Sequence, residues 1–357
     1  MKKYLLNVII TTVLLSAISS CKKATVPTPT PTPAPPLTPS VIAPPTPFGF
    51  YVVGYFPSYR SLTGVPAVKF KMCNVVNYAF ANINNTSNLV IANAAHFISV
   101  RDFAKANGAK VFISISGLAA DFKTAAADAN GRTVLVNKAM NIARTYQLDG
   151  IDIDWEFPRT DDGTDVMYTA FMKQLSDSCH SDRKYYLTAA ITAGKYPGAV
   201  RDAIKTELLT GNFIDWFNIM SYDDFNNILP YQHHTNLALA NTSMNYWVTN
   251  RGMPANKAVL GIAGYGRPSG IAVTTGLNLS FGDIVLQGGN PQSDSAVVSA
   301  NGVSNYTIYY NGIASVKKKA MLAKQMGNGI MLWEKSQDDH GSNSLLKAVC
   351  DTIGRVY

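Results

Sequence analysis

The stretch 148–158 reads LDGIDIDWEFP and places four acidic side chains among β-branched and aromatic residues. Residues of these two kinds at such density favour a strand. Side chains alternate between the faces of a strand, so Asp152, Asp154 and Glu156 share one face, about 6–7 Å apart at a rise of roughly 3.3 Å per residue. Asp149 has the opposite parity, and we expect it to form a turn or to cap a helix.

Three carboxylates on one face of a buried strand are unfavourable, because they repel each other and resist ionisation once they are removed from water. A purely structural strand gains nothing from this arrangement. An enzyme that cleaves glycosidic bonds needs one carboxyl group protonated beside another that is charged. The stretch therefore predicts a glycosidase whose active site contains this acidic face.

Eight β-like runs alternate with helical patterns along the chain. We predict strands at 51–55, 74–80, 110–114, 149–155, 186–192, 216–222, 258–263 and 329–333. Apolar stripes of helical spacing occur at 166–175 and 313–326, and Gly327 stands where a helix C-cap is expected. Eight strands with crossover helices in about 300 residues predict an α/β fold, a (β/α)8 TIM barrel. An open doubly wound sheet is the alternative, but the turn after the first strand lacks the GxGxxG phosphate motif.

A barrel of this kind gathers its functional side chains at the carboxyl ends of the strands. Polar and aromatic residues recur at these positions: Ser114, Ser116, Glu156, Met220, Tyr222, Asp223, Tyr265, Arg267 and Trp333. The longest gap, 268–312, lies between the seventh and eighth strands and is long for a βα loop. It predicts either a small hairpin wall beside the cleft or a decorated surface loop.

The first 47 residues have the composition of a targeting segment followed by a spacer. Residues 1–21 combine Lys2 and Lys3 with a short apolar run and small residues before Cys21, which predicts a secretory signal too short for a membrane span. Its ending, Ile-Ser-Ser-Cys, resembles a bacterial lipoprotein signal, in which the cysteine is lipidated after cleavage; an ordinary signal peptide is the alternative. Residues 22–47 contain ten of the 18 prolines and predict an extended linker, which leaves 48–357 as the catalytic domain.

These features predict an exported protein that is anchored to a membrane through lipid on Cys21, at the cell surface or on the periplasmic face. Without lipidation it is secreted.

The net charge of +8 is unevenly distributed along the chain, because the first 47 residues contribute four lysines and no acidic residue. The remaining charge is spread over the long domain, so nucleic-acid binding has little electrostatic support.

The other cysteines and the histidines suggest no metal or cofactor site. Cys73, Cys179 and Cys350 form no CxxC pair, so one disulfide is possible and at least one thiol stays free. The pair His233-His234 has no companion ligand at metal-binding spacing.

Six motifs, in order along the chain, resemble those of glycoside hydrolase family 18, the chitinase family. The run 149–156 matches the DGxDxDxE signature of that family. The other motifs are Val53-Gly54-Tyr55 and Asn77-Tyr78-Ala79-Phe80-Ala81 in the first two strands, Met220-Ser221-Tyr222-Asp223 (MxYD), Tyr265-Gly266-Arg267 (YGR) and the last strand, 329–333. The resemblance covers nearly the whole domain after the linker.

The resemblance implies hydrolysis of β-1,4 bonds beside N-acetylglucosamine with retention, in which the acetamido oxygen of the substrate attacks the anomeric carbon. Glu156 would act as acid and then as base, and Asp154 would orient and stabilise the acetamido group. Asp152 would lie behind Asp154 and share a proton with it. Tyr222 would donate its hydroxyl to the acetamido group.

The resemblance also implies a set of supporting residues around the sugar. Trp333 would be the apolar floor under the reacting sugar ring, and Asp223 and Arg267 would hydrogen-bond sugar oxygens. Tyr55 and Ser114 would hydrogen-bond the inner aspartates. Phe80 and Met220 would complete the substrate contacts. The expected partner is a polysaccharide or oligosaccharide that contains N-acetylglucosamine, bound by a monomer.

Three departures from the family pattern bear on the substrate. The SxGG motif is Ser114-Ile115-Ser116-Gly117, and Leu118 replaces the tryptophan that often follows. A tryptophan usual after the MxYD strand has no counterpart near Leu229-Pro230. Sugar rings stack on aromatic faces, so these losses predict a shallower cleft that acts on soluble or short chains. The alternatives are an endo-β-N-acetylglucosaminidase acting on N-glycans and a non-catalytic chitin-binding lectin, which the presence of the catalytic residues disfavours.

Overall fold

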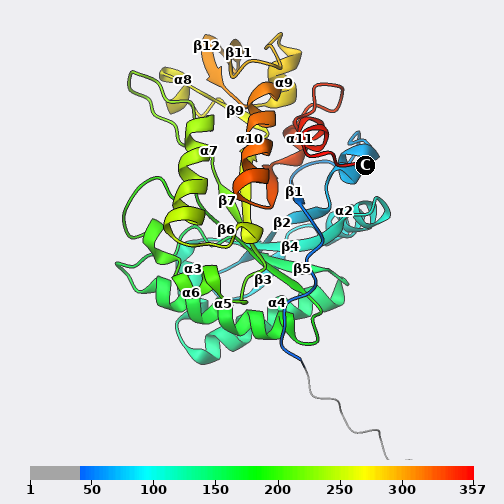
Figure 1. Ribbon diagram of the computed structural model, residues 1–357, viewed down its shortest axis with the longest axis vertical. Helices are drawn as coiled ribbons and strands as arrows, with labels where there is room; N and C mark the ends of the chain where they lie inside the picture. The colour runs from blue at the N-terminus through cyan, green and yellow to red at the C-terminus, as the bar shows by residue number, and fades with distance from the viewer. Residues whose placement is uncertain (1–40) are drawn as a thin grey trace, which may run out of the picture. The chain divides into compact units, whose positions relative to one another are not determined.

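The computed structural model describes residues 41–357 (Figure 1). The predicted signal with Cys21, and residues 22–40 of the predicted linker, lie outside the described residues. Within the described range, no helix combines the length and apolar character that a membrane crossing needs.

Eight parallel strands form a closed barrel, as the sequence predicted. They are β1 (Tyr51–Pro57), β2 (Val75–Ile83), β4 (Lys110–Ser116), β5 (Gly150–Ile153), β6 (Tyr186–Thr192), β7 (Trp216–Met220), β8 (Ala258–Ala263) and β13 (Gly329–Trp333). Each strand pairs in parallel with the next one in this order, and β13 pairs with β1, which closes the ring. This closure excludes the open doubly wound sheet.

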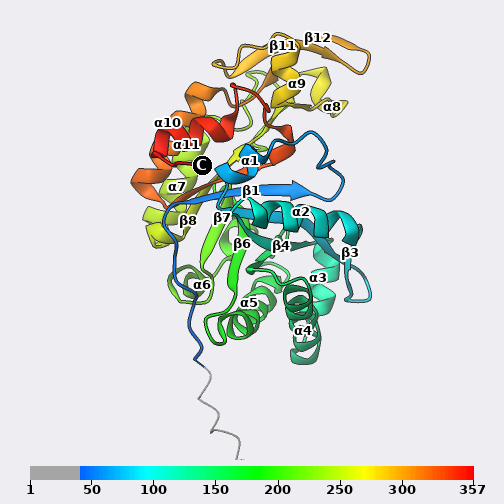
Figure 2. The ribbon, with the colours of Figure 1, turned by 90° about the vertical axis from the view of Figure 1, so that its right-hand side faces the viewer.

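Helices surround the barrel in both views (Figures 1 and 2). They are α1 (Ala67–Met72), α2 (Ala94–Ala106), α3 (Ala119–Ala126), α4 (Ala129–Thr145), α5 (Thr164–His180), α6 (Thr206–Thr210), α7 (Leu237–Met244), α10 (Ile313–Met326) and α11 (Leu345–Ile353). The predicted helix 166–175 is part of α5, and the predicted helix 313–326 coincides with α10. Gly327 is the C-cap of α10, as expected.

The side-chain alternation predicted for the acidic stretch is present, although regular strand pairing is shorter than predicted. β5 ends at Ile153, opposite Ala189 of β6, so Asp154 and Glu156 lie beyond the paired part of the strand. The alternation nevertheless continues, because Trp155 is buried on the helix side and stacks on Phe122 with ring centroids 4.8 Å apart. The acidic side chains therefore remain on the opposite face, toward the barrel mouth.

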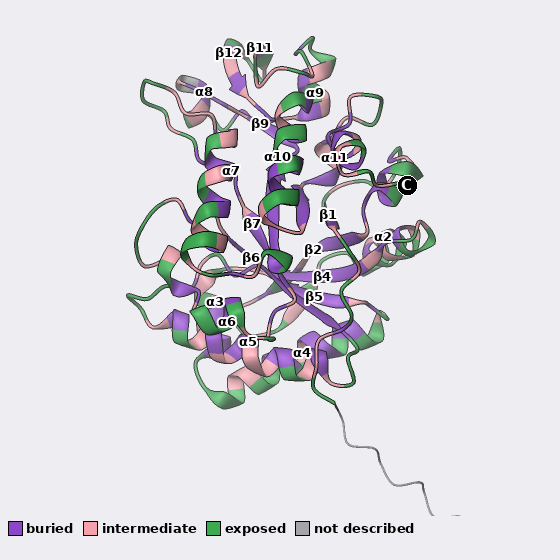
Figure 3. Cartoon of the chain, viewed as in Figure 1, coloured by how far each residue is buried: buried purple, intermediate pink, exposed green. Residues whose placement is uncertain are grey.

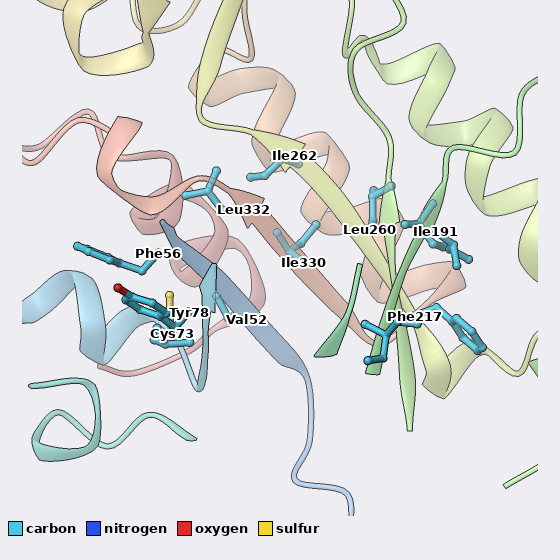
Figure 4. Close-up of a cluster of buried hydrophobic side chains, with 14 of the residues drawn as sticks. Val52, Phe56, Cys73, Tyr78, Ile191, Phe217, Leu260, Ile262, Ile330 and Leu332 are labelled. Carbon is cyan, nitrogen blue, oxygen red and sulfur yellow. The ribbon is translucent and has the colours of Figure 1, made fainter. Parts of the chain in front are cut away.

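Two apolar layers hold the barrel together. The larger layer lies between strands and helices, and Figure 4 shows some of its members, among them Val52, Phe217 and Ile262. Figure 3 shows the barrel strands almost wholly buried, whereas the helices expose their outer faces. The smaller layer fills the barrel interior with aromatic rings, and Tyr51 stacks on Trp216 with centroids 4.2 Å apart.

The segment between β8 and β13 forms an antiparallel sheet, so the hairpin wall is the correct one of the two alternatives. Its strands are β9 (Tyr265–Pro268), β10 (Leu279–Ser280), β11 (Ser295–Ala300) and β12 (Val303–Tyr309), with α8 (Ile271–Thr274) and α9 (Phe281–Leu286) between them. In both ribbon views β11 and β12 lie at the end of the molecule far from the start of the described chain. A short strand, β3 (Leu89–Ile91), pairs with β2.

The last residues of the predicted linker pack against the barrel at the amino-terminal ends of its strands. Ile42 forms a β-bridge with Ser181, and the hydroxyl of Tyr186 donates to the carbonyl of Thr46 at 2.7 Å. Phe48 then packs edge-on against Tyr186, with ring centroids 5.4 Å apart. The chain thus enters the domain at the end of the barrel opposite the carboxyl ends of the strands.

Candidate active site

Asp152 is fully buried inside the barrel and accepts four hydrogen bonds. Its Oδ2 accepts from the hydroxyls of Tyr55 and Ser114, both at 2.7 Å. Its Oδ1 accepts from the Thr188 hydroxyl at 2.6 Å and from the Asn218 amide at 3.1 Å. Burial raises the pKa of Asp152, while these four donors act in the opposite direction and stabilise the charged form.

Thr188 and Asn218 were not among the predicted site residues. Thr188 lies directly opposite Asp152 in the pairing of β5 with β6. Its parity within the predicted strand 186–192, taken together with the expected strand order, was the signal that could have identified it. Asn218 is a polar residue at the middle of an otherwise apolar strand, and its relation to Asp152 depends on the curvature of the barrel.

Asp154 has very different surroundings from Asp152. Its backbone N–H donates to the carbonyl of Ile115 at 2.9 Å, which fixes the main chain beyond β5. Its side chain is buried, and Oδ1 has no hydrogen-bond partner. Burial raises the pKa of Asp154 well above its usual range, the charges of Glu156 and Asp152 add to the rise, and the Ser116 hydroxyl opposes it. Among its described neighbours only the Ser116 hydroxyl stabilises the charged form of Asp154, so an N–H donor or a positive charge beside it would lower its pKa.

Glu156 opens into the same pocket. Removal of its carboxyl group from bulk water raises its pKa, and the charge of Asp223 raises it further. A carboxyl group whose pKa is raised keeps its proton at higher pH, which is the state that a general acid needs.

The Asp223 carboxylate is held by donors from β9. The Asp223 backbone adopts a left-handed conformation with φ 62°, which is unusual for a residue other than glycine. Its Oδ1 accepts from the Tyr265 hydroxyl and from Arg267 Nε, both at 2.6 Å. Burial alone would raise the pKa of Asp223, but His234, Arg267 and Tyr265 hold it well below its usual range. Asp223 is therefore a fixed negative charge at the pocket wall.

Aromatic rings form the side of the pocket near β1. Trp333, at the end of β13, lies 5.4 Å from Tyr55 and 5.7 Å from Phe80 between ring centroids, and it is nearly parallel to Phe80. Tyr222 lies at the end of β7, and burial raises the pKa of its hydroxyl well above its usual range, so that it stays a donor.

These residues line one cavity of about 510 Å³, within the range typical of ligand pockets. The predicted residues that line it are Tyr55, Phe80, Asp154, Glu156, Met220, Tyr222, Asp223 and Trp333. Asp152 and Ser114 lie beneath the cavity. Arg267 does not line the cavity but donates a hydrogen bond to the lining residue Asp223. Pocket residues that sequence reasoning missed include Lys195, Tyr196, Arg201 and Asp224, which lie in the segments after β6 and β7.

The serine that departs from the family pattern faces this pocket. Ser116 lines the cavity near Asp154, whereas a side chain at Gly117 would place its Cβ 2.6 Å from Ile83 Cγ2. Only the first of the two family glycines can therefore be replaced here without a clash.

Three residues considered in the sequence analysis lie outside the pocket and make contacts within the protein: Asp149, His233 and His234. Asp149 caps no helix but lies in the turn region between α4 and β5, where its Oδ2 accepts the Val111 N–H at 2.9 Å and lies 3.6 Å from Lys105 Nζ. His233 Nε2 lies 2.8 Å from the Tyr310 carbonyl oxygen, and His234 lies beside Asp223.

The described part of the chain contains no group of three or more His, Cys, Asp or Glu side chains arranged to hold a metal ion. Cys73, Cys179 and Cys350 are buried and free.

Residues 51–338 match the family model of the glycosyl hydrolases family 18. The chain belongs to this family. A probable endochitinase of Caenorhabditis elegans is 33% identical over 168 residues, which cover 41% of this chain and 26% of that protein. Endochitinase 1 of Metarhizium robertsii is 26% identical over 284 residues, 69% of this chain and 65% of that protein. The chain thus spans less than two thirds of the length of either relative.

Solved structures share the fold. The family 18 chitinase ChiB from the chitin utilization locus of Flavobacterium johnsoniae is 26% identical with a TM-score of 0.70, over 85% of this chain and 94% of that one. A chitinase from Bacteroides thetaiotaomicron is 22% identical with a TM-score of 0.73, over 86% and 97% of the two chains. A family 18 chitinase from Cycas revoluta, solved with (GlcNAc)3, is 23% identical with a TM-score of 0.73, over 85% and 100%.

Proposed function

We propose that this protein hydrolyses β-1,4-linked polymers or oligomers of N-acetylglucosamine, such as chitin and chito-oligosaccharides, with retention and with the help of the substrate's acetamido group. The observation that carries the proposal is the convergence of Glu156, Asp154 and Tyr222 on one pocket beside Trp333. Family membership and the chitinases among its relatives support the same reaction.

In the first step the reacting sugar lies over Trp333, and Glu156 gives its proton to the oxygen of the leaving sugar. The bond from that oxygen to the anomeric carbon breaks as the acetamido oxygen bonds to the same carbon, which gives an oxazolinium ion. Asp154 accepts the acetamido N–H and stabilises the positive charge, and Tyr222 donates its hydroxyl to the acetamido group. Asp154 lines the pocket in which this contact would form.

In the second step the Glu156 carboxylate removes a proton from water, and the water oxygen attacks the anomeric carbon. The oxazolinium ring opens, and the acetamido group is restored. Two displacements on the same carbon retain its configuration. Asp152 remains beneath, where its four donors keep a fixed negative charge near the developing cation.

The test is the hydrolysis of chitotetraose by the wild type and by Glu156→Gln. General acid–base catalysis contributes about 10²–10⁴-fold, so we expect turnover to fall by at least the lower figure. Circular dichroism and the melting temperature should be unchanged, because Glu156 lies at the pocket surface. Hydrolysis by the variant at the wild-type rate would contradict the assignment.

One observation favours a second candidate, an endo-β-N-acetylglucosaminidase acting on N-glycans. Leu118 replaces a tryptophan common in the family, and the tryptophan usual after the MxYD strand has no counterpart near Leu229; these two leucines are 71% and 73% exposed and do not line the pocket. The missing stacking platforms at these positions leave room for a branched saccharide. Release from a high-mannose glycopeptide faster than from chito-oligomers would support this candidate over the first.

We also propose that the protein is exported and held at a membrane by lipid on Cys21, and that it acts as a monomer. The proposal is supported by the composition of residues 1–21 and by the proline-rich run that follows. Wild-type protein should be found in the membrane fraction of the host, and Cys21→Ala in the soluble fraction. Equal partition of the two forms would exclude the lipid anchor.

A further inference from the structure

Lys319 of α10 is fully buried, and its ammonium donates three hydrogen bonds. The acceptors are the Thr235 carbonyl, the Thr235 hydroxyl at 3.0 Å and Asn311 Oδ1 at 2.6 Å. None of these acceptors carries a charge. A lysine is almost never fully buried unless it is paired, because the loss of its hydration is costly. Burial lowers the pKa of Lys319 to about 7, which reflects that cost.

The packing of α10 does not require a lysine at this position. Lys319 lies on the buried face of the helix with Val316, Ala320 and Ala323, whereas Lys318 is exposed. An apolar side chain could fill the same place without the cost of burying a charge. The charge therefore serves the contacts that the ammonium makes, not the packing of the helix.

The Thr235 hydroxyl connects Lys319 to the end of β7. An ammonium can only donate, so this hydroxyl accepts from Lys319 and keeps its own proton for another acceptor. That acceptor is the Ser221 carbonyl, at 3.0 Å. Ser221 lies between Met220, the last residue of β7, and Tyr222. Through one hydroxyl, Lys319 thus fixes the main chain where it leaves β7 toward Tyr222.

The segment that Lys319 holds also contacts the next two residues of the loop. The Asp224 N–H donates to the His234 carbonyl at 3.0 Å, and the Asp223 N–H donates to His234 Nδ1 at 3.4 Å. His234 immediately precedes Thr235. The left-handed backbone of Asp223 costs free energy and persists only where surrounding contacts impose it. These contacts therefore help to hold the Asp223 carboxylate at the pocket wall.

Asn311 extends the same network to β8. Its Nδ2 donates at 3.1 Å to the carbonyl of Ala263, the last residue of β8. Two residues further along, the Tyr265 hydroxyl donates to Asp223. One ammonium therefore joins the carboxyl ends of two paired strands, and it does so from outside the pocket, which Lys319 does not line.

We propose that Lys319 is a positioning residue for the hydrolysis, whose buried ammonium holds the ends of β7 and β8 so that Tyr222 and Asp223 keep their places beside the reacting sugar. The inference rests on the proposed function, in which Tyr222 donates to the acetamido group and the charge of Asp223 acts on Glu156. Both residues act at the reacting ring, so displacement of their loop should lower kcat and leave KM nearly unchanged.

The first test is Thr235→Val, which removes the hydroxyl but keeps the shape of the side chain and the carbonyl that accepts from Lys319. A hydrogen bond of ordinary strength predicts that kcat on chitotetraose falls about fivefold. Thr235→Ser keeps the hydroxyl and should restore most of the wild-type kcat. Thr169→Val is the matched control, since the buried Thr169 hydroxyl donates to the Asp165 carbonyl within α5, and Thr169 does not line the pocket. Its kcat should equal that of the wild type.

The second test is Lys319→Met, which replaces the ammonium by an unbranched apolar chain. Both strand ends lose their donor, so kcat should fall about tenfold, again with KM nearly unchanged. In a Tyr222→Phe background the same substitution should lower kcat less, because a residue that acts through Tyr222 has less to lose there. Lys319→Met also leaves buried acceptors unsatisfied and lowers stability, so Thr235→Val decides if this variant does not fold.

Hydrogen–deuterium exchange follows the loop without substrate. The amides of Asp223 and Asp224, which donate to His234, should exchange faster in Thr235→Val than in the wild type. The same amides should exchange at the wild-type rate in Thr169→Val.

The outcomes separate the two proposals. If the wild type cleaves chitotetraose and Thr235→Val keeps the wild-type kcat and exchange rates, Lys319 does not position the loop, and the proposed function stands. An equal fall of kcat in Thr235→Val and Thr169→Val would mean a general loss of packing and would also exclude the positioning role. If the wild type does not cleave chitotetraose, the proposed function fails, and the role of Lys319 in that reaction fails with it.

Discussion

Asp152 and Asp154 are two residues apart on the same face of one strand, yet their surroundings are opposite. The two carboxylate oxygens of Asp152 accept four hydrogen bonds, one each from β1, β4, β6 and β7, so the charge and the position of this side chain are fixed. Asp154 is nearly as buried, but its Oδ1 has no partner. Asp154 also lines the pocket, whereas Asp152 does not, so a substrate can reach Asp154 but not Asp152. In the proposed mechanism, Asp152 therefore supports the site and Asp154 takes part in the reaction.

The largest effect that tests this contrast is on the activity of Asp154→Asn. Loss of the charge that stabilises the oxazolinium ion should lower kcat on chitotetraose by about 10²–10³-fold. Stability should fall less than in Asp152→Asn, because the Asp154 side chain has one hydrogen-bond donor, the Ser116 hydroxyl, where Asp152 has four. Steady-state kinetics and urea unfolding measure the two quantities on one preparation. A large loss of stability with kcat unchanged would reverse the roles assigned to the two aspartates.

The next effect is on the stability of Asp152→Asn. An amide in place of the carboxylate turns one acceptor into a donor, which then faces the donors that Asp152 now accepts. An unsatisfied buried polar group costs about 1–3 kcal/mol, and the free energy of unfolding should fall by that amount. Urea unfolding beside Asp154→Asn gives a matched comparison, since the two substitutions are chemically identical. Equal stability of the two variants would remove the distinction.

The smallest effect is a shift in the pH dependence of Asp223→Asn. Burial raises the pKa of Glu156, and the charge of Asp223 raises it further, so removal of that charge lowers the pKa. Glu156 acts as an acid in its protonated form, and activity is lost as pH rises through its pKa. The alkaline limb of the profile of kcat/KM against pH should therefore move to lower pH.

The control for this profile is Asp202→Asn, which removes a half-exposed carboxylate that pairs with Arg201 and does not act on Glu156. Its alkaline limb should coincide with that of the wild type. An Asp223→Asn profile whose alkaline limb stays in place, or moves to higher pH, would show that the charge of Asp223 does not act on Glu156.

Strand parity was sufficient to predict the acidic face, because period-two alternation depends only on neighbours in the chain. It placed Trp155 outside and Asp152 inside before any contact was known, and the alternation of strands with helices predicted the barrel. The motifs predicted eight of the twenty residues that line the pocket, since these residues lie in the strands or follow directly on them.

The residues that escaped prediction depend on contacts between distant parts of the chain. Thr188 matters because the register of β6 brings it opposite Asp152. Tyr196 lines the pocket, and its hydroxyl donates to Asp224, which lies 28 positions away in the chain. The antiparallel sheet β9–β12 was one of two open alternatives, because its short apolar runs carry little periodicity.

The most direct test of the central claim is the identity of the sugar at each newly formed reducing end when partially N-acetylated chitosan is digested. If the acetamido group of the substrate is the nucleophile, with Asp154 beside it, every cut requires N-acetylglucosamine on the glycosyl side of the bond. We predict that sequencing of the products by mass spectrometry finds N-acetylglucosamine at all new reducing ends. Glucosamine at those ends, formed at a comparable rate, would contradict the account.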